Sequence, residues 1–256
     1  MQKKLVTLLS IAGSDPTGGA GIQADIRVGS SLGLHVATAV TAVTVQNSNG
    51  FYEMGYVDPS LLQSQLQAII NEVTPNAIKI GMLGSKENFP VVSDFLKSID
   101  KKIPVVIDPI LKASLENQII DEEYLMNLYC HFLFPYSTVI TPNLPEFNIL
   151  KDTYKDWERL NLVIKGGHLE GEEIEDILII KNKKLSTSHK RIECSNLHGT
   201  GCVFSSFFAS YLALEYSVEE SFYLTSQKIQ DIIAGSCNYT LGLSTYGPLN
   251  INNYKL

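Results

Sequence analysis

Short apolar segments that each end in a polar residue or a glycine most constrain the fold of this 256-residue sequence. Between them lie helix-like segments such as 62–73, where apolar side chains recur on one helical face. This alternation predicts an α/β fold with a mainly parallel, doubly wound sheet. An antiparallel hairpin over 176–180 and 185–192 is expected at its border. The predicted parallel strands cover residues 5–11, 36–45, 77–80, 104–107, 139–140 and 162–164.

The composition is that of an ordinary globular protein, and we expect one domain over residues 1–256. Hydrophobic residues make up 45% and charged residues 18%, and no run of 18 apolar residues could span a membrane. A formal net charge of −7 argues against a nucleic-acid partner. The charge does not argue against a nucleotide, because glycine amides, a lysine and Mg²⁺ can meet its phosphates locally.

The cysteines and the first residues bear on the cellular compartment. No two cysteines have the spacing of a zinc site or a disulfide framework, which favours a reducing compartment and therefore the cytoplasm. Two lysines followed by apolar residues at the start also resemble a signal peptide. The dense glycine motif that follows at once favours a first buried strand instead. The cysteines are Cys130, Cys194, Cys202 and Cys237.

The stretch His198-Gly-Thr-Gly-Cys202 runs directly into a helix-like segment. Gly199 and Gly201 allow a tight turn around Thr200, and a helix start presents free N–H groups and the positive end of the helix dipole. These are the features of an anion site, and phosphate is its usual ligand. The same field favours a thiolate at Cys202. Taken alone, the stretch equally fits a glycine turn followed by a buried cysteine.

A second glycine-rich stretch, 13–25, follows the first predicted strand and reads GSDPTGGAGIQAD. Four glycines in nine residues indicate close approach of the backbone to a ligand. Neither the dinucleotide fingerprint nor the GxxxxGK[ST] phosphate loop is present, so a nucleotide would be held by another device. The ordinary alternatives are that Asp15 caps a turn and that Asp25 lies on a helix surface.

Polar groups also follow the other predicted strands. In an open α/β sheet ligands bind at the carboxyl ends of the strands, so these groups are expected to line one edge. They are Gln46-Asn47, Gly81-Met82, Asp108-Pro109, the run from Thr141 to Glu146, and Lys165-Gly-Gly-His168.

Together and in this order, the motifs resemble those of the hydroxymethylpyrimidine/phosphomethylpyrimidine kinases, the thiamine branch of the ribokinase-like superfamily. The resemblance runs from about Leu5 to Asn250 and implies a single-domain, three-layer α/β/α fold. It implies phosphorylation of 4-amino-5-hydroxymethyl-2-methylpyrimidine with ATP and Mg²⁺, and leaves open whether the monophosphate is also a substrate. We also expect a homodimer. The alternatives are a pyridoxine/pyridoxal kinase and a non-catalytic pyrimidine-binding protein; the GTGC and N-x-x-E motifs argue against the latter.

The resemblance assigns the phosphate side of the site. Gly199, Thr200 and Gly201 would stabilise the transferring γ-phosphoryl group. Cys202 would deprotonate or orient the substrate hydroxyl. The N-x-x-E motif would help to hold Mg²⁺ and the phosphates, and a further carboxylate and a lysine would lie nearby, although a solvated lysine is the ordinary alternative. These four residues are Asn143, Glu146, Asp108 and Lys165.

On the substrate side, the Gln46 amide would pair with the edge of the aminopyrimidine. Other matched positions surround the ring or pack on its faces, namely Gly13, Ala20, Asp25, Thr44, Met82 and Ile110. The sequence departs from the family in two places. The loop 110–116 lacks an expected glycine, and the segment 147–161 is short, so an outer helix should be shortened or lost.

Overall fold

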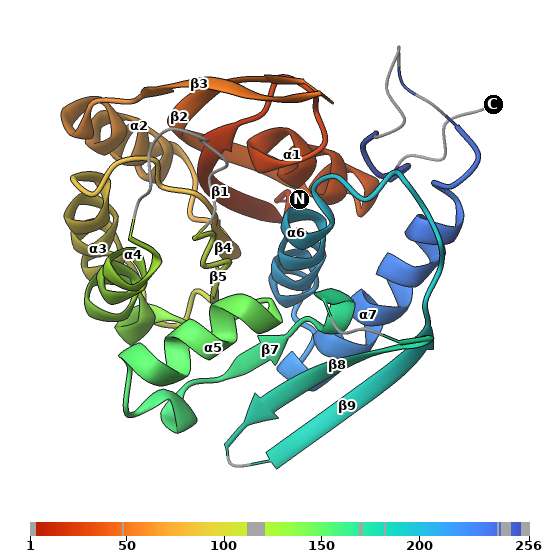
Figure 1. Ribbon diagram of the computed structural model, residues 1–256. Coiled ribbons are helices and arrows are strands. Elements are labelled where there is room, and N and C mark those ends of the chain that lie inside the picture. The colour runs from red at the N-terminus through yellow and green to blue at the C-terminus, as the bar shows by residue number, and fades with distance from the viewer. Residues whose placement is uncertain are drawn as a thin grey trace.

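The computed structural model describes residues 4–47, 49–111, 121–168, 171–181, 183–239, 241 and 247–251. Its strands form one sheet in the order β3-β2-β1-β4-β5-β6-β7-β8-β9 (Figure 1). One continuous sheet fits the single domain predicted over residues 1–256. The strands are β1 Thr7–Ser14, β2 His35–Asn47, β3 Gly50–Tyr56, β4 Ala77–Ile80, β5 Val105–Ile107, β6 Val139–Ile140, β7 Leu162–Ile164, β8 Glu173–Ile180 and β9 Lys183–Lys190.

The predicted fold class is confirmed. The six strands from β2 to β7 in the sheet order pair in parallel, and β8 and β9 form the expected antiparallel hairpin at one edge. The other edge carries a strand that we did not predict, β3, which pairs antiparallel with β2. Its residues are exposed or half-buried, so β3 lacks the apolar run that marks a buried strand.

Helices cover both faces of the sheet, as three layers require. The helices α1 (Gly21–Ser31), α6 (Thr200–Ala213) and α7 (Val218–Ala234) share one apolar core with the sheet. The helices α2 (Pro59–Glu72), α3 (Asn88–Ser98), α4 (Glu122–Leu128) and α5 (Leu144–Thr153) share the other. Single turns occur at Tyr129–Leu133, Phe134–Tyr136, Trp157–Arg159 and Gly166–His168. No helix within the described ranges is long and apolar enough to cross a membrane.

Both departures from the family pattern can be located. Between α5 and β7 the chain forms only the short turn Trp157–Arg159, which agrees with the predicted loss of an outer helix. Trp157 packs edge-on against Phe147, with ring centroids 5.2 Å apart, and so covers the end of this core. Of the loop 110–116, Ile110 and Leu111 are described and 112–116 lies outside the described residues.

Candidate active site

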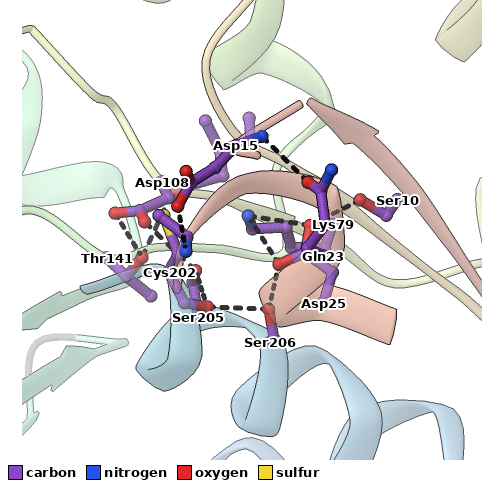
Figure 2. A network of polar contacts seen from close by, with 12 residues as sticks. Ser10, Asp15, Gln23, Asp25, Lys79, Asp108, Thr141, Cys202, Ser205 and Ser206 are labelled. Atoms are coloured by element: carbon purple, nitrogen blue, oxygen red, sulfur yellow. Dashed lines mark hydrogen bonds and ion pairs between the residues drawn. The ribbon is translucent and has the colours of Figure 1, made fainter. Parts of the chain in front are cut away.

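The first turn of α6 begins half-buried and brings Cys202 beside Asp108, which directly follows β5 at the carboxyl end of that strand (Figure 2). Gly199 precedes the helix with a φ of +79°, a left-handed conformation that favours glycine. A Cβ at Gly199 would stand 1.8 Å from the Gly19 carbonyl oxygen, so the two glycine-rich loops touch here. Among the described residues no side chain caps the helix start. The Thr200 N–H donates to the Leu197 carbonyl at 3.2 Å, and the N–H groups that follow it can bind an anion.

An ion pair lies beside these amides. Lys165, directly after β7, has its ammonium nitrogen 2.8 Å from Asp108 Oδ1, directly after β5. Asp108 also accepts hydrogen bonds from Ser205 (3.1 Å) and Thr141 (3.4 Å). Burial disfavours the Lys165 charge, but Asp108 and Glu146 outweigh it and raise the pKa of the ammonium. A Cβ at Gly201 would stand 3.4 Å from the Lys165 nitrogen, which places the pair against the predicted phosphate loop.

The N-x-x-E motif forms a capping box at the start of α5. Asn143 Oδ1 accepts from the Glu146 N–H at 2.9 Å, and Glu146 Oε2 accepts from the Asn143 N–H at 2.8 Å. Burial raises the pKa of Glu146 to about 7, with Lys165 opposing the shift and the Asp108 charge adding to it. Within the described parts of the chain no three metal-ligating side chains form a cluster.

A second ion pair, Lys79–Asp25, lies behind the start of α6. Its shortest nitrogen–oxygen distance is 3.0 Å, and both side chains are 0% exposed. Asp25 also accepts hydrogen bonds from Ser10 and Ser206. The alternative that Asp25 lies on a helix surface is therefore wrong. Its enclosed carboxylate supports the site from behind, and a direct contact with substrate stays a prediction without geometric support.

Cys202 lies between the two pairs in the first turn of α6 and is 9% exposed. Burial raises the pKa of its thiol, with the charges of Asp108 and Asp25 adding to the shift. The Lys79 charge and the Gly21 N–H oppose it without overcoming it. Burial and the two carboxylates oppose the thiolate that the helix start favours, so the thiolate at Cys202 stays a prediction.

On the substrate side the structure brings Gly13, Thr44 and Met82 together. A Cβ at Gly13 would stand 2.5 Å from Met82 Cε, and the Thr44 hydroxyl donates to the Ser14 carbonyl at 2.9 Å. Gln46 is half-buried near the end of β2, where the register with β3 shifts between Val45 and Gln46. Such a bulge re-aims a side chain. The half-buried Ile110 packs against the core that contains α6.

The family of the chain follows from comparison with known proteins. The family model for phosphomethylpyrimidine kinase matches residues 15–250. The chain belongs to this family. It is therefore a kinase of the thiamine-biosynthesis branch that uses ATP, as the sequence motifs predicted.

The relatives cover the chain almost completely. A hydroxymethylpyrimidine/phosphomethylpyrimidine kinase of Staphylococcus aureus is 30% identical over 259 residues, which are 94% of this chain and 92% of that protein. The thiamine biosynthesis multifunctional protein ThiED of Corynebacterium glutamicum is 31% identical over 95% of the chain, which spans 33% of that longer protein. An ADP complex of a Bacillus subtilis pyridoxal kinase has a TM-score of 0.81 at 27% identity, covering 96% of this chain and 97% of that one.

The kinase also contains site residues that sequence reasoning missed. Lys79 is one, although a lysine inside an otherwise apolar strand signals a buried counter-charge. The other is His198, whose Nε2 lies 2.9 Å from Asp15 Oδ2. Asp15 caps its own turn as the ordinary alternative expected, accepting from Thr17 and from the Ala20 N–H. Burial would raise the pKa of Asp15, but His198 and Thr17 hold it below its usual range.

Proposed function

We propose that this kinase transfers the γ-phosphoryl group of ATP to the hydroxymethyl group of 4-amino-5-hydroxymethyl-2-methylpyrimidine. The observation that carries the proposal is that Gly21 joins the two halves of the site. Its N–H favours negative charge on the Cys202 sulfur, and a Cβ on it would stand 2.2 Å from the Gly13 carbonyl oxygen. The phosphate loop and the predicted ring-binding residues therefore meet at Cys202.

Gln46 gives the substrate side its specificity in this proposal. Its amide carries both donors and an acceptor, which matches a ring nitrogen next to an amino group. Met82 and Ile110 supply apolar contacts to the ring faces, while Gly13, Ala20 and Thr44 shape the pocket wall. Asp25 acts from behind through its buried contacts. An aminopyrimidine satisfies these groups with few unpaired polar atoms.

The phosphate side performs an in-line transfer. The N–H groups of Gly199 and Gly201 stabilise charge on the transferring phosphoryl group. The Leu197 carbonyl fixes Thr200 between them, accepting from its N–H at 3.2 Å and from its hydroxyl at 2.7 Å. Lys165 reaches the phosphates and remains paired with Asp108. Cys202 first loses its thiol proton to water. The substrate oxygen then attacks the γ-phosphorus and its proton passes to the Cys202 thiolate, while the bond from the γ-phosphorus to the β,γ-bridging oxygen breaks and ADP leaves with that oxygen.

The donor set fits Mg²⁺ held mostly through water and phosphate. Asp108 and Glu146 are two buried carboxylates close enough for the charge of one to raise the pKa of the other. Glu146 already accepts the Asn143 N–H, and the Leu111 N–H also favours its charged form, so its oxygens are partly occupied by the protein before any direct ligation. Mg²⁺ commonly uses one or two carboxylates together with substrate phosphates and water. When bound, the ion would neutralise charge on the phosphates of ATP.

Steady-state kinetics with a panel of alcohols test the substrate assignment. The panel is hydroxymethylpyrimidine, its monophosphate, pyridoxine and pyridoxal, each with ATP and Mg²⁺. We expect the highest kcat/KM for hydroxymethylpyrimidine. The likeness to a pyridoxal kinase favours pyridoxal as the second candidate. A higher kcat/KM for pyridoxal would reverse the assignment, and no turnover of any alcohol would favour the pyrimidine-binding protein.

We further propose a homodimer formed through the β2–β3 edge. Four apolar or aromatic side chains there are about half exposed, and an uncovered edge strand of this kind invites pairing. They are Val43, Val45, Tyr52 and Tyr56. Sedimentation should give twice the monomer mass, and Val45→Asp should return it to 28.3 kDa. A monomeric parent protein would refute the dimer. The cytoplasmic location stays a prediction from the cysteine spacing.

A further inference from the structure

The Lys79–Asp25 pair touches neither the pyrimidine nor the phosphates in the transfer described so far, yet it joins four elements at one buried point. Lys79 comes from β4 and Asp25 from α1, with nitrogen–oxygen distances of 3.0 and 3.1 Å. The remaining hydrogen bonds to Asp25 come from Ser10 of β1 and Ser206 of α6 (Figure 2). No part of either charged side chain reaches solvent.

The stability of the fold does not account for such a pair. Removing two charges from water costs free energy, and packed apolar side chains of similar volume are often at least as stable. The neighbours of Lys79 in β4, Ile78 and Ile80, are fully buried and show that this strand accommodates apolar side chains. The groups that surround the two charges must therefore explain why charged side chains are buried here.

The pair lies next to Cys202 and Asp108, on the protein side of these residues and away from solvent. Lys79 Nζ lies 3.0 Å from the position that a Cβ on Gly81 would occupy, directly below the Gly81-Met82 turn. Its charge acts on both Cys202 and Asp108. The Ser206 hydroxyl that contacts Asp25 also lies 2.7 Å from the Cys202 carbonyl oxygen. The Lys79 charge is therefore fixed in place, and the first turn of α6, which carries Cys202, is held at the same site.

We propose that Lys79 and Asp25 are positioning residues for phosphoryl transfer, acting on Cys202. Lys79 holds a fixed positive charge behind the sulfur and so favours negative charge on it. Asp25 holds Lys79 in place and, through Ser206, fixes the first turn of α6. The other groups that act on the sulfur are Asp108 and Asp25, which disfavour its ionisation, and the Gly21 N–H, which favours it. The proposal rests on the proposed role of Cys202 as proton acceptor.

Thiol alkylation tests this without relying on turnover. Iodoacetamide reacts with the thiolate, so its rate at each cysteine, read by peptide mass spectrometry from pH 7 to 10, reports ionisation. We expect Lys79→Met to slow alkylation of Cys202 about tenfold or more, the effect of losing a nearby opposite charge. The double variant Lys79→Met/Asp25→Asn removes both charges and leaves no unpaired buried ion. It should slow the alkylation of Cys202 by a smaller factor than Lys79→Met does. Its kcat should fall while the KM for ATP is unchanged.

Cys130 is the internal control. It is buried, burial raises the pKa of its thiol to about 12, and no cation contributes to that value. The alkylation rate of Cys130 should be unchanged in both variants, whereas a loosened structure would raise the alkylation rates of both Cys130 and Cys202. A folded double variant whose Cys202 reacts as fast as in the parent would overturn the proposal. If the Cys202 rate falls but Cys202→Ser keeps the parent kcat, the electrostatic effect stands and the proposed proton acceptor fails.

Discussion

Two lysine–aspartate pairs flank the start of α6, and adjacent serines of that helix bind them. Ser206 donates to Asp25 of the pair with Lys79, and Ser205 donates to Asp108 of the pair with Lys165. The first pair is 0% exposed at both side chains. In the second pair the lysine is 13% exposed and the aspartate 3%.

This difference in exposure separates two uses of the same residue types. A phosphate can approach Lys165 from solvent, so that pair can bind a ligand directly. Nothing can reach Lys79, so the other pair can act only through protein groups and through its electric field. A charge in a protein interior acts more strongly than in water, and the enclosed pair can therefore influence Cys202 without touching substrate.

The largest effect is expected at Cys202, which both pairs face. Cys202→Ser is nearly isosteric, but a serine hydroxyl is too weak an acid to ionise there. We expect the variant to fold, to bind an ATP analogue normally and to lose about 10²–10⁴-fold in kcat, the usual contribution of a general base. Cys202→Asp should recover part of the activity. Parent-like kcat in a folded Cys202→Ser variant would mean that transfer depends on positioning and charge alone.

Lys165→Met breaks the open pair and should have the next largest effect. Losing a charge that stabilises the transferring group should lower kcat/KM for ATP about 10²-fold or more. Pyrimidine affinity, measured by calorimetry, should stay within about twofold because the lost contact is to phosphate. Lys151→Met, an exposed lysine over the Phe147 ring on α5, is the control and should leave both values unchanged. An equal loss of pyrimidine affinity would show that the two sides are not separable.

The sequence was sufficient for the parts of the site that are local in the chain. The apolar strands, the polar groups at their ends and the loop 198–202 each form within a few residues, and their order predicted both the fold and the family. β3 was missed because it is an edge strand whose position depends on pairing with β2.

The pairings across the chain could not be predicted. Lys79 and Asp25 are 54 residues apart, and His198 and Asp15 are 183 apart, so no local pattern joins them. The groups that oppose a thiolate at Cys202 also lie far away in the sequence. A helix start favours a thiolate, but burial and the carboxylates of two distant segments act on the same sulfur and dominate.

Gln46→Ala sharpens the comparison from the substrate side. Losing the amide leaves ring-edge groups unpaired at a cost of about 1–3 kcal/mol, so hydroxymethylpyrimidine should bind about 10- to 100-fold more weakly. ATP affinity should not change. Gln67→Ala removes an exposed glutamine that donates to Asn71 on α2 and serves as the control. Unchanged pyrimidine affinity in Gln46→Ala would count against the aminopyrimidine as substrate.

The smallest effect is expected on pH dependence, where two capping boxes differ as the two ion pairs do. Glu146 of α5 is buried and its pKa is raised to about 7, whereas Glu220 of α7 is exposed and hydrogen bonds from Ser217 lower its pKa. A raised carboxyl pKa means that the folded protein binds more protons than the unfolded chain. The contribution of Glu146 to stability is therefore present below its unfolded pKa of about 4.5 and is lost as the pH rises through about 7.

Glu146→Gln should remove this trend and keep the capping geometry. Relative to the variant, the parent should lose about 1–2 kcal/mol of unfolding free energy between pH 5 and 7, measured by urea denaturation. Glu220→Gln is the matched control with the opposite sign, because a lowered pKa gives stability that is lost as the pH falls. Parallel pH profiles for the parent and Glu146→Gln would show that Glu146 is already ionised at pH 5. Asp108 and Lys165 would then face a fixed negative charge, and the phosphate side would be less electropositive than the geometry implies.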